Sequence, residues 1–261
     1  MKEATTALQE QYRDSSNFRK RTALIGRFGT NTYGWYRWVF DQIQFAGHCA
    51  VLELGCGPGT LWKHNIDRIP PGTIVLSDFS AGMLRDCARN LGAHASAFRI
   101  CQLDAAALPF RNGSLNAVVA NMMFYHVENR AKALQDVKRV LGRGGTFYAT
   151  TTGREYMREL QEATNRILGI ARRAVSAERF GLETGYEQLA SVFNHVETRR
   201  YENSLRVTEV QPLMDYFLSM TPFISAPAER WSALREHFEG IIATRGKIHI
   251  PIDTGMLIAR N

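Results

Sequence analysis

The sequence predicts an α/β protein built on a doubly wound, mostly parallel sheet. Short apolar runs alternate with helix-like segments from residue 50 to residue 152, which is the order that parallel strands with crossover helices produce. The first three runs are apolar along most of their length, as expected of strands buried on both faces. The chain has 261 residues, 45% of them hydrophobic and 22% charged, a composition typical of one large globular domain.

The first part of the chain contains the regular alternation. Strands are expected at 50–55, 73–78, 98–104, within 115–124 and at 145–152. Helices are expected at 61–69, 80–93 and 130–141. The helix at 80–93 has clear boundaries, because Ser80 can cap its amino end and Gly92 follows its last apolar residue. Gly142 is expected to end the helix at 130–141 in the same way.

After residue 153 the alternation stops. Helical patterns occupy 154–175, 185–193, 209–220 and 229–245, and a strand is expected at 195–207. The last residues, 247–260, read as a pair of short strand runs around a turn or bulge at Thr254–Gly255. We expect the late helices, together with residues 1–45, to form a cap over the sheet.

The composition restricts the location and the metal chemistry. No run approaches the roughly 18 apolar residues of a membrane helix, and the polar start of the chain lacks the apolar core of a signal peptide. We therefore expect a cytoplasmic protein with no membrane partner. The cysteines are scattered, with no CxxC pair, so no metal is expected; they are Cys49, Cys56, Cys87 and Cys101.

The net charge of +7 raises the question of a nucleic-acid partner. The basic residues are spread along the chain, and NFRKR (17–21) is their densest cluster. A short run of this kind is typical of a solvated surface. We therefore do not expect nucleic acid as a partner.

The stretch VLELGCGPGTLW (51–62) places three glycines between the first strand and the first helix. Glycine permits a positive φ and lets a ligand approach the main chain closely. The spacing of Gly55, Gly57 and Gly59 is GxGxG and not the GxGxxG of dinucleotide sites. Glu53 precedes the first glycine by two residues. A carboxylate there suits a positively charged ligand better than a pyrophosphate.

Acidic residues also end the next two strands. Asp78 can accept two hydrogen bonds from a ribose diol, although it can also serve as a cap or turn residue. Asp104 can accept from an exocyclic amine while the amide of Ala105 donates to a ring nitrogen. Taken alone, Asp104 reads equally well as a helix N-cap. With Glu53 and Asp78 at neighbouring strand ends, the ligand-binding interpretation is favoured.

Several motifs follow one another in the order VLELGCGPG, LSDFSAGML, CQLDAAALPF, LNAVVANMMFYHVEN and LGRGGTFYATTT. In their order and spacing the chain resembles the class I S-adenosylmethionine (SAM)-dependent methyltransferases. The resemblance covers residues 45–152, and the last strands are similar to the family's reversed terminal hairpin. It implies an antiparallel last strand and helical caps from the amino-terminal and late insertions.

The resemblance also implies a domain organisation. We expect a single methyltransferase domain over residues 1–261, with an N-terminal helical lid at 1–45. Residues 46–152 would form the SAM-binding core, and residues 153–261 the late strands with cap helices. The oligomeric state is expected to be a monomer or a homodimer.

The family's roles place the methionine part of SAM at the glycine loop. Backbone around Gly55 and Gly57 would hold it, and the same loop includes Cys56 and Gly59. Glu53 would act on the ammonium group of SAM. Asn121, just after the fourth strand, would supply a carbonyl beside the methionine and the reactive methyl.

The resemblance places the adenosine part along the next two strands. Asp78 would bind the ribose hydroxyls, and Phe79 would lie against the adenine with help from Met83. Asp104 and the amide of Ala105 would contact the adenine edge. The cofactor is thus SAM, the product is S-adenosylhomocysteine, and no metal is implied.

The acceptor side is less defined. Tyr125 and His126 follow the fourth strand, where His126 could be a general base, bind the SAM carboxylate or be a structural histidine. The residues 121–124, NMMF, depart from the NPPY-type signature of adenine or glutamine methylation. This departure argues against a nucleic-acid base as the acceptor.

Aromatic residues cluster just before the first strand: Tyr33, Trp35, Tyr36, Trp38 and Phe40. They could pack one face of a helix on the sheet, or form a lid over an apolar acceptor. In the second case Tyr33, Trp35, Tyr36 and Met123 would contact the acceptor. The cap segments add apolar side chains that suit a small acceptor in an enclosed cavity, namely Met157, Met214, Tyr216, Phe217 and Met220.

The sequence therefore predicts a SAM-dependent methyltransferase that acts on a small organic molecule of secondary metabolism. One alternative is an RNA or protein methyltransferase of the same fold. Another, of a different class, is a non-catalytic SAM-binding regulatory module. An NAD-dependent dehydrogenase is disfavoured because the spacing of the glycine loop differs.

Overall fold

The computed structural model describes residues 10–45, 47–170, 175–220 and 225–261. The chain divides into two compact units, each built from three segments. Unit 1 consists of Met1–Thr32, Glu155–Ala174 and Glu202–Asp253. Unit 2 consists of Tyr33–Arg154, Val175–Tyr201 and Thr254–Asn261.

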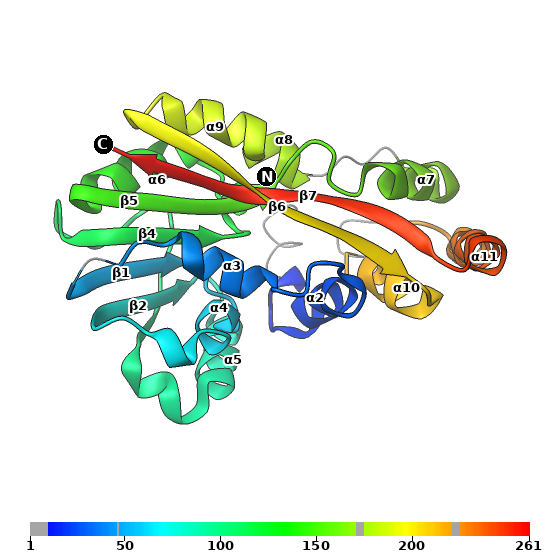
Figure 1. Ribbon diagram of the computed structural model, residues 1–261, viewed down its shortest axis with the longest axis horizontal. Coiled ribbons are helices and arrows are strands. Elements are labelled where there is room, and N and C mark those ends of the chain that lie inside the picture. Colours follow the sequence, from blue (N-terminus) through cyan, green and yellow to red (C-terminus); the bar gives the residue numbers. More distant parts are fainter. Residues whose placement is uncertain (1–9, 46, 171–174, 221–224) are drawn as a thin grey trace. The chain divides into compact units, whose positions relative to one another are not determined.

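The strands of the described residues form one seven-stranded sheet in the order β3-β2-β1-β4-β5-β7-β6 (Figure 1). The pairs from β3 to β5 are parallel, and β7 is antiparallel to β5. This arrangement confirms the predicted mostly parallel sheet with an antiparallel last strand. The strands are β1 (Cys49–Leu54), β2 (Gly72–Asp78), β3 (Arg99–Gln102), β4 (Leu115–Asn121), β5 (Leu141–Thr152), β6 (His195–Val207) and β7 (Ile248–Arg260).

Helices of unit 2 cover both faces of the sheet, as a doubly wound fold requires. One face packs on α3 (Trp35–Gln42), α4 (Thr60–Lys63) and α5 (Ala81–Leu91). The other packs on α6 (Arg130–Val140), α8 (Val175–Phe180) and α9 (Leu182–Ala190) (Figure 1). Alternation along β4 divides the two cores: Ala117 and Val119 belong to the first, and Val118 and Ala120 to the second.

The edge strand β3 differs from its prediction. We expected it to be buried on both faces, but Arg99 and Gln102 are exposed and the two residues between them are half-buried. These residues are exposed because β3 is an edge strand, which among the described strands pairs with β2 alone. β3 also ends at Gln102, two residues earlier than the predicted end at Asp104.

The predicted helix at 61–69 is broken into α4 and the 3₁₀ turn η1 (Ile66–Arg68). Asn65 lies between them, fully buried. Its side-chain Nδ2 donates to the carbonyl oxygens of Leu61 at 2.8 Å and Tyr36 at 3.1 Å. An asparagine amide that binds nearby carbonyls competes with helical hydrogen bonds, and this ends α4.

The last strand also differs from its prediction. Residues 248–260 form one continuous strand, with no turn at Thr254–Gly255. Gly255 is required for another reason: a Cβ there would lie 2.3 Å from the carbonyl oxygen of Arg199. Gly142, expected after the helix, instead lies within β5, because α6 passes directly into that strand at Leu141.

Smaller elements complete unit 2. The cap prediction for α5 is confirmed, because the Ser80 side chain accepts from the amide of Met83 and Gly92 follows the helix. The 3₁₀ turns η2 (Gly92–Ala97) and η3 (Phe124–His126) follow α5 and β4.

Among the described residues, no helix combines the length and the apolar character needed to cross a bilayer.

Unit 1 contains α2 (Ser16–Phe28), α7 (Arg158–Leu168), α10 (Val210–Leu218) and α11 (Ala228–Arg245). The helical pattern predicted at 154–175 is interrupted, since Gly169 with φ 68° ends α7. Residues 171–174 of that pattern lie outside the described residues.

The apolar side chains that we related to an acceptor cavity form the core of unit 1. Met157, Met214, Tyr216 and Phe217 are buried there, and Met220 packs against them. Their number therefore reflects the packing of this unit.

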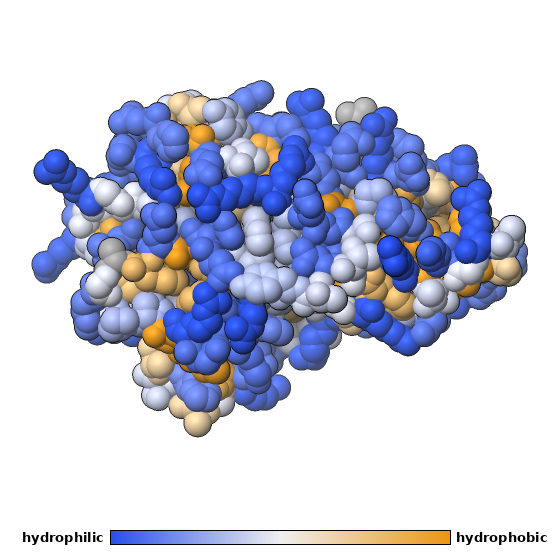
Figure 2. Space-filling view, in the orientation of Figure 1, coloured by the Kyte–Doolittle hydropathy of each residue, from blue (hydrophilic) through white to orange (hydrophobic). Residues whose placement is uncertain are grey.

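The face of the molecule in Figure 2 is mainly hydrophilic, and hydrophobic residues show through in separate patches.

Candidate functional site

The three glycines of the loop after β1 have different surroundings. All three have a positive φ, of 61° at Gly55, 54° at Gly57 and 72° at Gly59. A Cβ on Gly55 would lie 2.7 Å from the Met123 side chain, and one on Gly59 would lie 2.7 Å from Cys87 Sγ. A Cβ on Gly57 would meet no atom within 4 Å. Packing thus explains two of the glycines, and Gly57 alone faces open space.

Asp78 joins this loop to the end of β2. Its Oδ2 accepts from the amide of Gly57 at 2.9 Å, and its Oδ1 accepts from the amide of Ser80 at 2.8 Å. Desolvation raises the pKa of Asp78, and these backbone hydrogen bonds act in the opposite direction. Each carboxylate oxygen can accept a second hydrogen bond. Phe79, next in the chain, is 56% exposed.

Glu53 lies in the interior at the end of β1 and is 1% exposed. Its Oε2 accepts from the indole Nε1 of Trp62 at 2.7 Å. Desolvation raises the pKa of Glu53 to about 8, with a further contribution from the negative charge of Asp78, although the Trp62 hydrogen bond acts against it. A buried carboxyl of this kind is stabilised in its charged form by a cation.

The remaining predicted cofactor residues differ in exposure. Asp104 is exposed, and its Oδ1 accepts from the amide of Ala106 at 2.8 Å. Ala105 and Met83 are both buried. Cys56 is also buried, and its Sγ lies 3.6 Å from the carbonyl oxygen of Gly57. Asp104 therefore keeps an accessible carboxylate, whereas Met83 belongs to the interior.

The carboxyl end of β4 is held by side chains from other elements. Asn121 Oδ1 accepts from Thr150 Oγ1 at 2.7 Å and from Trp35 Nε1 at 3.3 Å. Thr150 Oγ1 also accepts from the amide of Met122 at 2.9 Å. Met122 has a φ of 54°, in the left-handed region that few side chains adopt. The turn after β4 is therefore fixed by Thr150 and linked to α3 by Trp35.

The residues after this turn form η3. The rings of Tyr125 and His126 lie 4.5 Å apart at a tilted angle, and both side chains are half-buried. The Met123 side chain packs against Gly55. The structure thus brings Met123 to the glycine loop.

The aromatic residues of α3, and Tyr33 just before it, have different contacts. Trp35 packs on Trp38 and Tyr201, with ring centroids 5.4 and 5.2 Å apart. Tyr36 stacks on His64 with centroids 5.0 Å apart. Tyr33 is 53% exposed, and its hydroxyl donates to Asp41. The segment is therefore not a single aromatic face.

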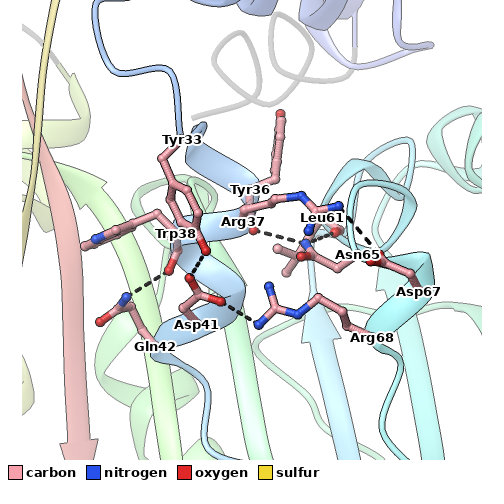
Figure 3. A network of polar contacts seen from close by, with 10 residues as sticks. All are labelled: Tyr33, Tyr36, Arg37, Trp38, Asp41, Gln42, Leu61, Asn65, Asp67 and Arg68. Atoms are coloured by element: carbon pink, nitrogen blue, oxygen red, sulfur yellow. Dashed lines mark hydrogen bonds and ion pairs between the residues drawn. The ribbon is translucent and has the colours of Figure 1, made fainter.

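Polar contacts hold the outer side of α3 (Figure 3). Asp41, which accepts from Tyr33, also accepts from Arg68 at 2.6 Å. A second ion pair joins Arg37 to Asp67 at 3.7 Å. At the end of the segment, the amide of Gln44 donates to the hydroxyl of Tyr148 at 3.0 Å. These contacts fix α3 and the residues after it to other parts of unit 2.

Sequence reasoning missed the partners that position the predicted residues. Trp62 holds Glu53, and Thr150 holds Asn121. Thr150 is the register partner of Asn121 across β4 and β5, so it could be found once the sheet order is known. Trp62 has no such signal, because an apolar helix position predicts burial and not a hydrogen bond.

The described residues fit SAM on three observations. Open space lies at Gly57, a buried carboxyl suited to a cation lies at Glu53, and an exposed aromatic ring lies beside Asp78 at Phe79. A buried carboxyl suits the ammonium in the methionine part of SAM, and an exposed aromatic ring suits the adenine of its nucleoside. Within the described ranges, no cluster of three or more His, Cys, Asp or Glu side chains could hold a metal ion.

Comparisons with known proteins support the same class. Residues 51–145 match a family model described as a methyltransferase domain. A malonyl-[acyl-carrier protein] O-methyltransferase of Legionella pneumophila is 29% identical over 127 residues, which are 48% of this chain and 44% of that protein. A demethylmenaquinone methyltransferase of Thermus thermophilus is 32% identical over 111 residues, 42% of this chain and 50% of the relative. The chain thus spans about half the length of these curated relatives.

A solved structure extends the likeness to the fold. A putative methyltransferase from an antibiotic biosynthesis pathway of Anabaena variabilis superimposes with a TM-score of 0.63 and 12% identity. The match covers 87% of this chain and 96% of that one. The fold is that of the class I SAM-dependent methyltransferases. Residues 51–145, the part that matches the family model, are similar to a methyltransferase domain.

Proposed function

We propose that the protein transfers a methyl group from SAM to a small organic acceptor. The observation that carries the proposal is the pair of acids around Gly57, because Asp78 binds the Gly57 amide while Glu53 lies buried at the preceding strand end. When bound there, SAM supplies an electrophilic methyl group on a sulfonium. The relatives support the acceptor class, since one is named for a malonyl group on acyl-carrier protein and the other for demethylmenaquinone.

The residues of unit 2 then have separate tasks. Glu53 neutralises the ammonium of the cofactor, and Asp78 accepts from the ribose hydroxyls through the lone pairs that its backbone donors leave. Phe79 covers the adenine, and Asp104 with the Ala105 amide contacts its edge. These contacts orient the cofactor, and alignment of reacting groups is the main requirement for displacement at carbon.

The acceptor side is proposed at the end of β4. Trp35, linked to Asn121, and Met123, packed on Gly55, offer apolar surface next to the cofactor loop. His126, with Tyr125 beside it in η3, is the residue proposed to accept a proton if the nucleophile must lose one. We place the acceptor in secondary metabolism, which is consistent with the antibiotic biosynthesis pathway of the Anabaena protein.

The test of this function is calorimetric binding of S-adenosylhomocysteine to wild type and Asp78→Ala. We expect the variant to bind about 1–3 kcal/mol more weakly, or roughly 5- to 150-fold, because a hydrogen-bonding charge is lost. Glu187→Ala is the matched control, since Glu187 is an exposed acid on α9 in the same unit. Unchanged affinity in a folded Asp78→Ala protein would remove Asp78 from the site.

Methyl transfer requires its own assay. Wild-type protein is incubated with methyl-labelled SAM and with separate pools of metabolites, RNA and protein, and the labelled product is identified. Label in the small-molecule pool supports the proposal. Label only in RNA or protein favours the macromolecular alternative, which the net charge of +7 leaves open, and SAM binding without any product favours a regulatory module.

A further inference from the structure

The connection between β3 and β4 has no regular structure of its own. All of residues 103–114 lie in the described part of the chain, and none of them belongs to a helix or a strand. The connection leads from the edge strand past β2 and β1, a crossover that usually contains a helix. It also carries Asp104 and Ala105, the residues proposed for the adenine edge. Its backbone polar groups therefore need partners outside a helix or sheet ladder.

The first part of the connection is held by short-range contacts. The amide of Leu103 donates to the carbonyl oxygen of Asp78 at 3.1 Å. Asp104 then forms a turn, in which its carbonyl oxygen accepts from the amide of Ala107 at 3.0 Å and its Oδ1 accepts from the amide of Ala106 at 2.8 Å. The direction of the Asp104 side chain therefore depends on where the residues after the turn are held.

Arg139, in the last turn of α6, holds those residues. Its Nη2 donates to the carbonyl oxygen of Leu108 at 2.9 Å, and its Nη1 donates to that of Phe110 at 2.7 Å and to Asn112 Oδ1 at 3.0 Å. Its Nε donates to Asp136 Oδ1 at 2.7 Å. A guanidinium presents its N–H donors in a rigid plane, so one side chain fixes three points of the connection at once.

Asp136, one turn earlier on α6, completes the attachment. Its Oδ2 accepts from the amide of Leu108 at 2.6 Å, so Leu108 is held through both its amide and its carbonyl. The Leu108 side chain is buried in the core that contains Leu134 and Val137 of α6. Burial acts to raise the pKa of Asp136, but the hydrogen bonds from Arg139 and Leu108 lower it on balance. The carboxylate is therefore charged at neutral pH.

We infer that Arg139 and Asp136 are positioning residues for the adenine part of the site and act without contacting the cofactor. By fixing Leu108, they hold the turn at Asp104, whose carboxylate selects the exocyclic amine of adenine. The inference rests on the proposed function, because it assumes that SAM binds at these strand ends. The planar guanidinium is essential to it, since a lysine ammonium does not reproduce the same fork of donors.

The test compares two ligands that differ at one group of the base. S-Adenosylhomocysteine has an exocyclic amine on its adenine, and S-inosylhomocysteine has a carbonyl oxygen there. We expect calorimetry to show that wild type prefers S-adenosylhomocysteine roughly 10- to 100-fold, because a donor to a charged acceptor is replaced by a second acceptor. Arg139→Lys and Asp136→Asn should each lower this ratio by roughly fivefold or more, since lysine lacks the planar fork and asparagine replaces one acceptor oxygen with a donor.

The matched control is Arg89→Lys on α5. Arg89 pairs with Asp86 at 3.0 Å and at the same three-residue spacing, but it makes no part of the inferred attachment, so its ratio should equal that of wild type. A purely structural role of Arg139 and Asp136 would weaken the binding of both ligands equally. An unchanged ratio in the two variants would therefore overturn the inference, as would a wild type that binds both ligands equally.

Binding of S-adenosylhomocysteine to wild type separates this inference from the proposed function. If wild type binds it and the ratio stays constant in the variants, the SAM site stands and the positioning role falls. If wild type binds neither ligand, both fall. Asn112→Ala removes a single contact of Arg139 at an exposed position, and it keeps the test possible if the other variants fail to fold. It should lower the ratio in the same direction and by less.

Discussion

The carboxyl ends of β2 and β4 differ in what their polar side chains contact. At β2, Asp78 binds backbone amides of adjoining loops and lies beside the exposed ring of Phe79. At β4, Asn121 is occupied by side chains of Thr150 and Trp35 from a strand and a helix far along the chain. In the proposed function the end of β2, with Glu53 and the glycine loop after its neighbour β1, is the ligand-binding end. The end of β4 is the anchoring end, because it holds α3.

The largest expected effect concerns the ligand-binding end, where the buried Glu53 lowers the free energy of unfolding at high pH. With the pKa of Glu53 raised from 4.5 to about 8, the folded protein keeps a proton that the unfolded chain loses in this interval. The contribution of Glu53 to stability is therefore full below pH 4.5, falls as the pH rises to about 8, and is level above. Glu53→Gln should remove this fall. The free energy of unfolding of the ligand-free variant, taken relative to that of wild type, should therefore be higher at pH 8.5 than at pH 4.5 by on the order of 2–4 kcal/mol.

Denaturant unfolding of the ligand-free proteins across this pH range measures that difference. Glu187→Gln, on an exposed position of α9, is the control for removing one carboxylate. If Glu53→Gln and wild type show parallel pH profiles, Glu53 titrates as an ordinary acid. The comparison between the two strand ends would then lose its electrostatic basis.

A smaller effect separates the glycines that serve packing from the one that faces open space. Gly59→Ala should lower the free energy of unfolding by about 2–3 kcal/mol, because a positive φ costs about 1–2 kcal/mol and the new Cβ meets Cys87. Gly57→Ala should cost about 1 kcal/mol, since only its backbone is strained. Gly57→Ala should nevertheless weaken S-adenosylhomocysteine binding more. The reverse order of binding losses would place the ligand elsewhere.

The smallest effect concerns the anchoring end. Trp35→Phe retains an aromatic ring but removes the donor to Asn121, and we expect it to lower the free energy of unfolding by about 0.5–1 kcal/mol. Its effect on S-adenosylhomocysteine binding should be smaller than that of Gly57→Ala. Trp38→Phe, in the same ring cluster, controls for loss of indole area. A Trp35→Phe protein that binds the ligand as weakly as Gly57→Ala would show that the two ends are not separate.

Local signals in the sequence suggested most of the residues that we propose for the ligand-binding end. The GxGxG spacing, the acids at strand ends and the Ser80 cap each depend on residues close in sequence, and the cap is confirmed. The anchoring end depends on Asn121 meeting Trp35, 86 residues away, and no periodicity encodes that contact. The continuous β7 was mispredicted for a similar reason, because Gly255 is required by the neighbouring β6 and not by a turn.

The path of the chain through its two units has a consequence for the order of folding. Unit 1 draws its segments from 1–32, 155–174 and 202–253, and contacts such as Arg27 with Glu209 join residues 182 positions apart. Closing such long loops is entropically unfavourable and slows folding. During synthesis, α2 must therefore wait for most of the chain before its partners exist. We expect unit 1 to be the last part of the molecule to acquire its core.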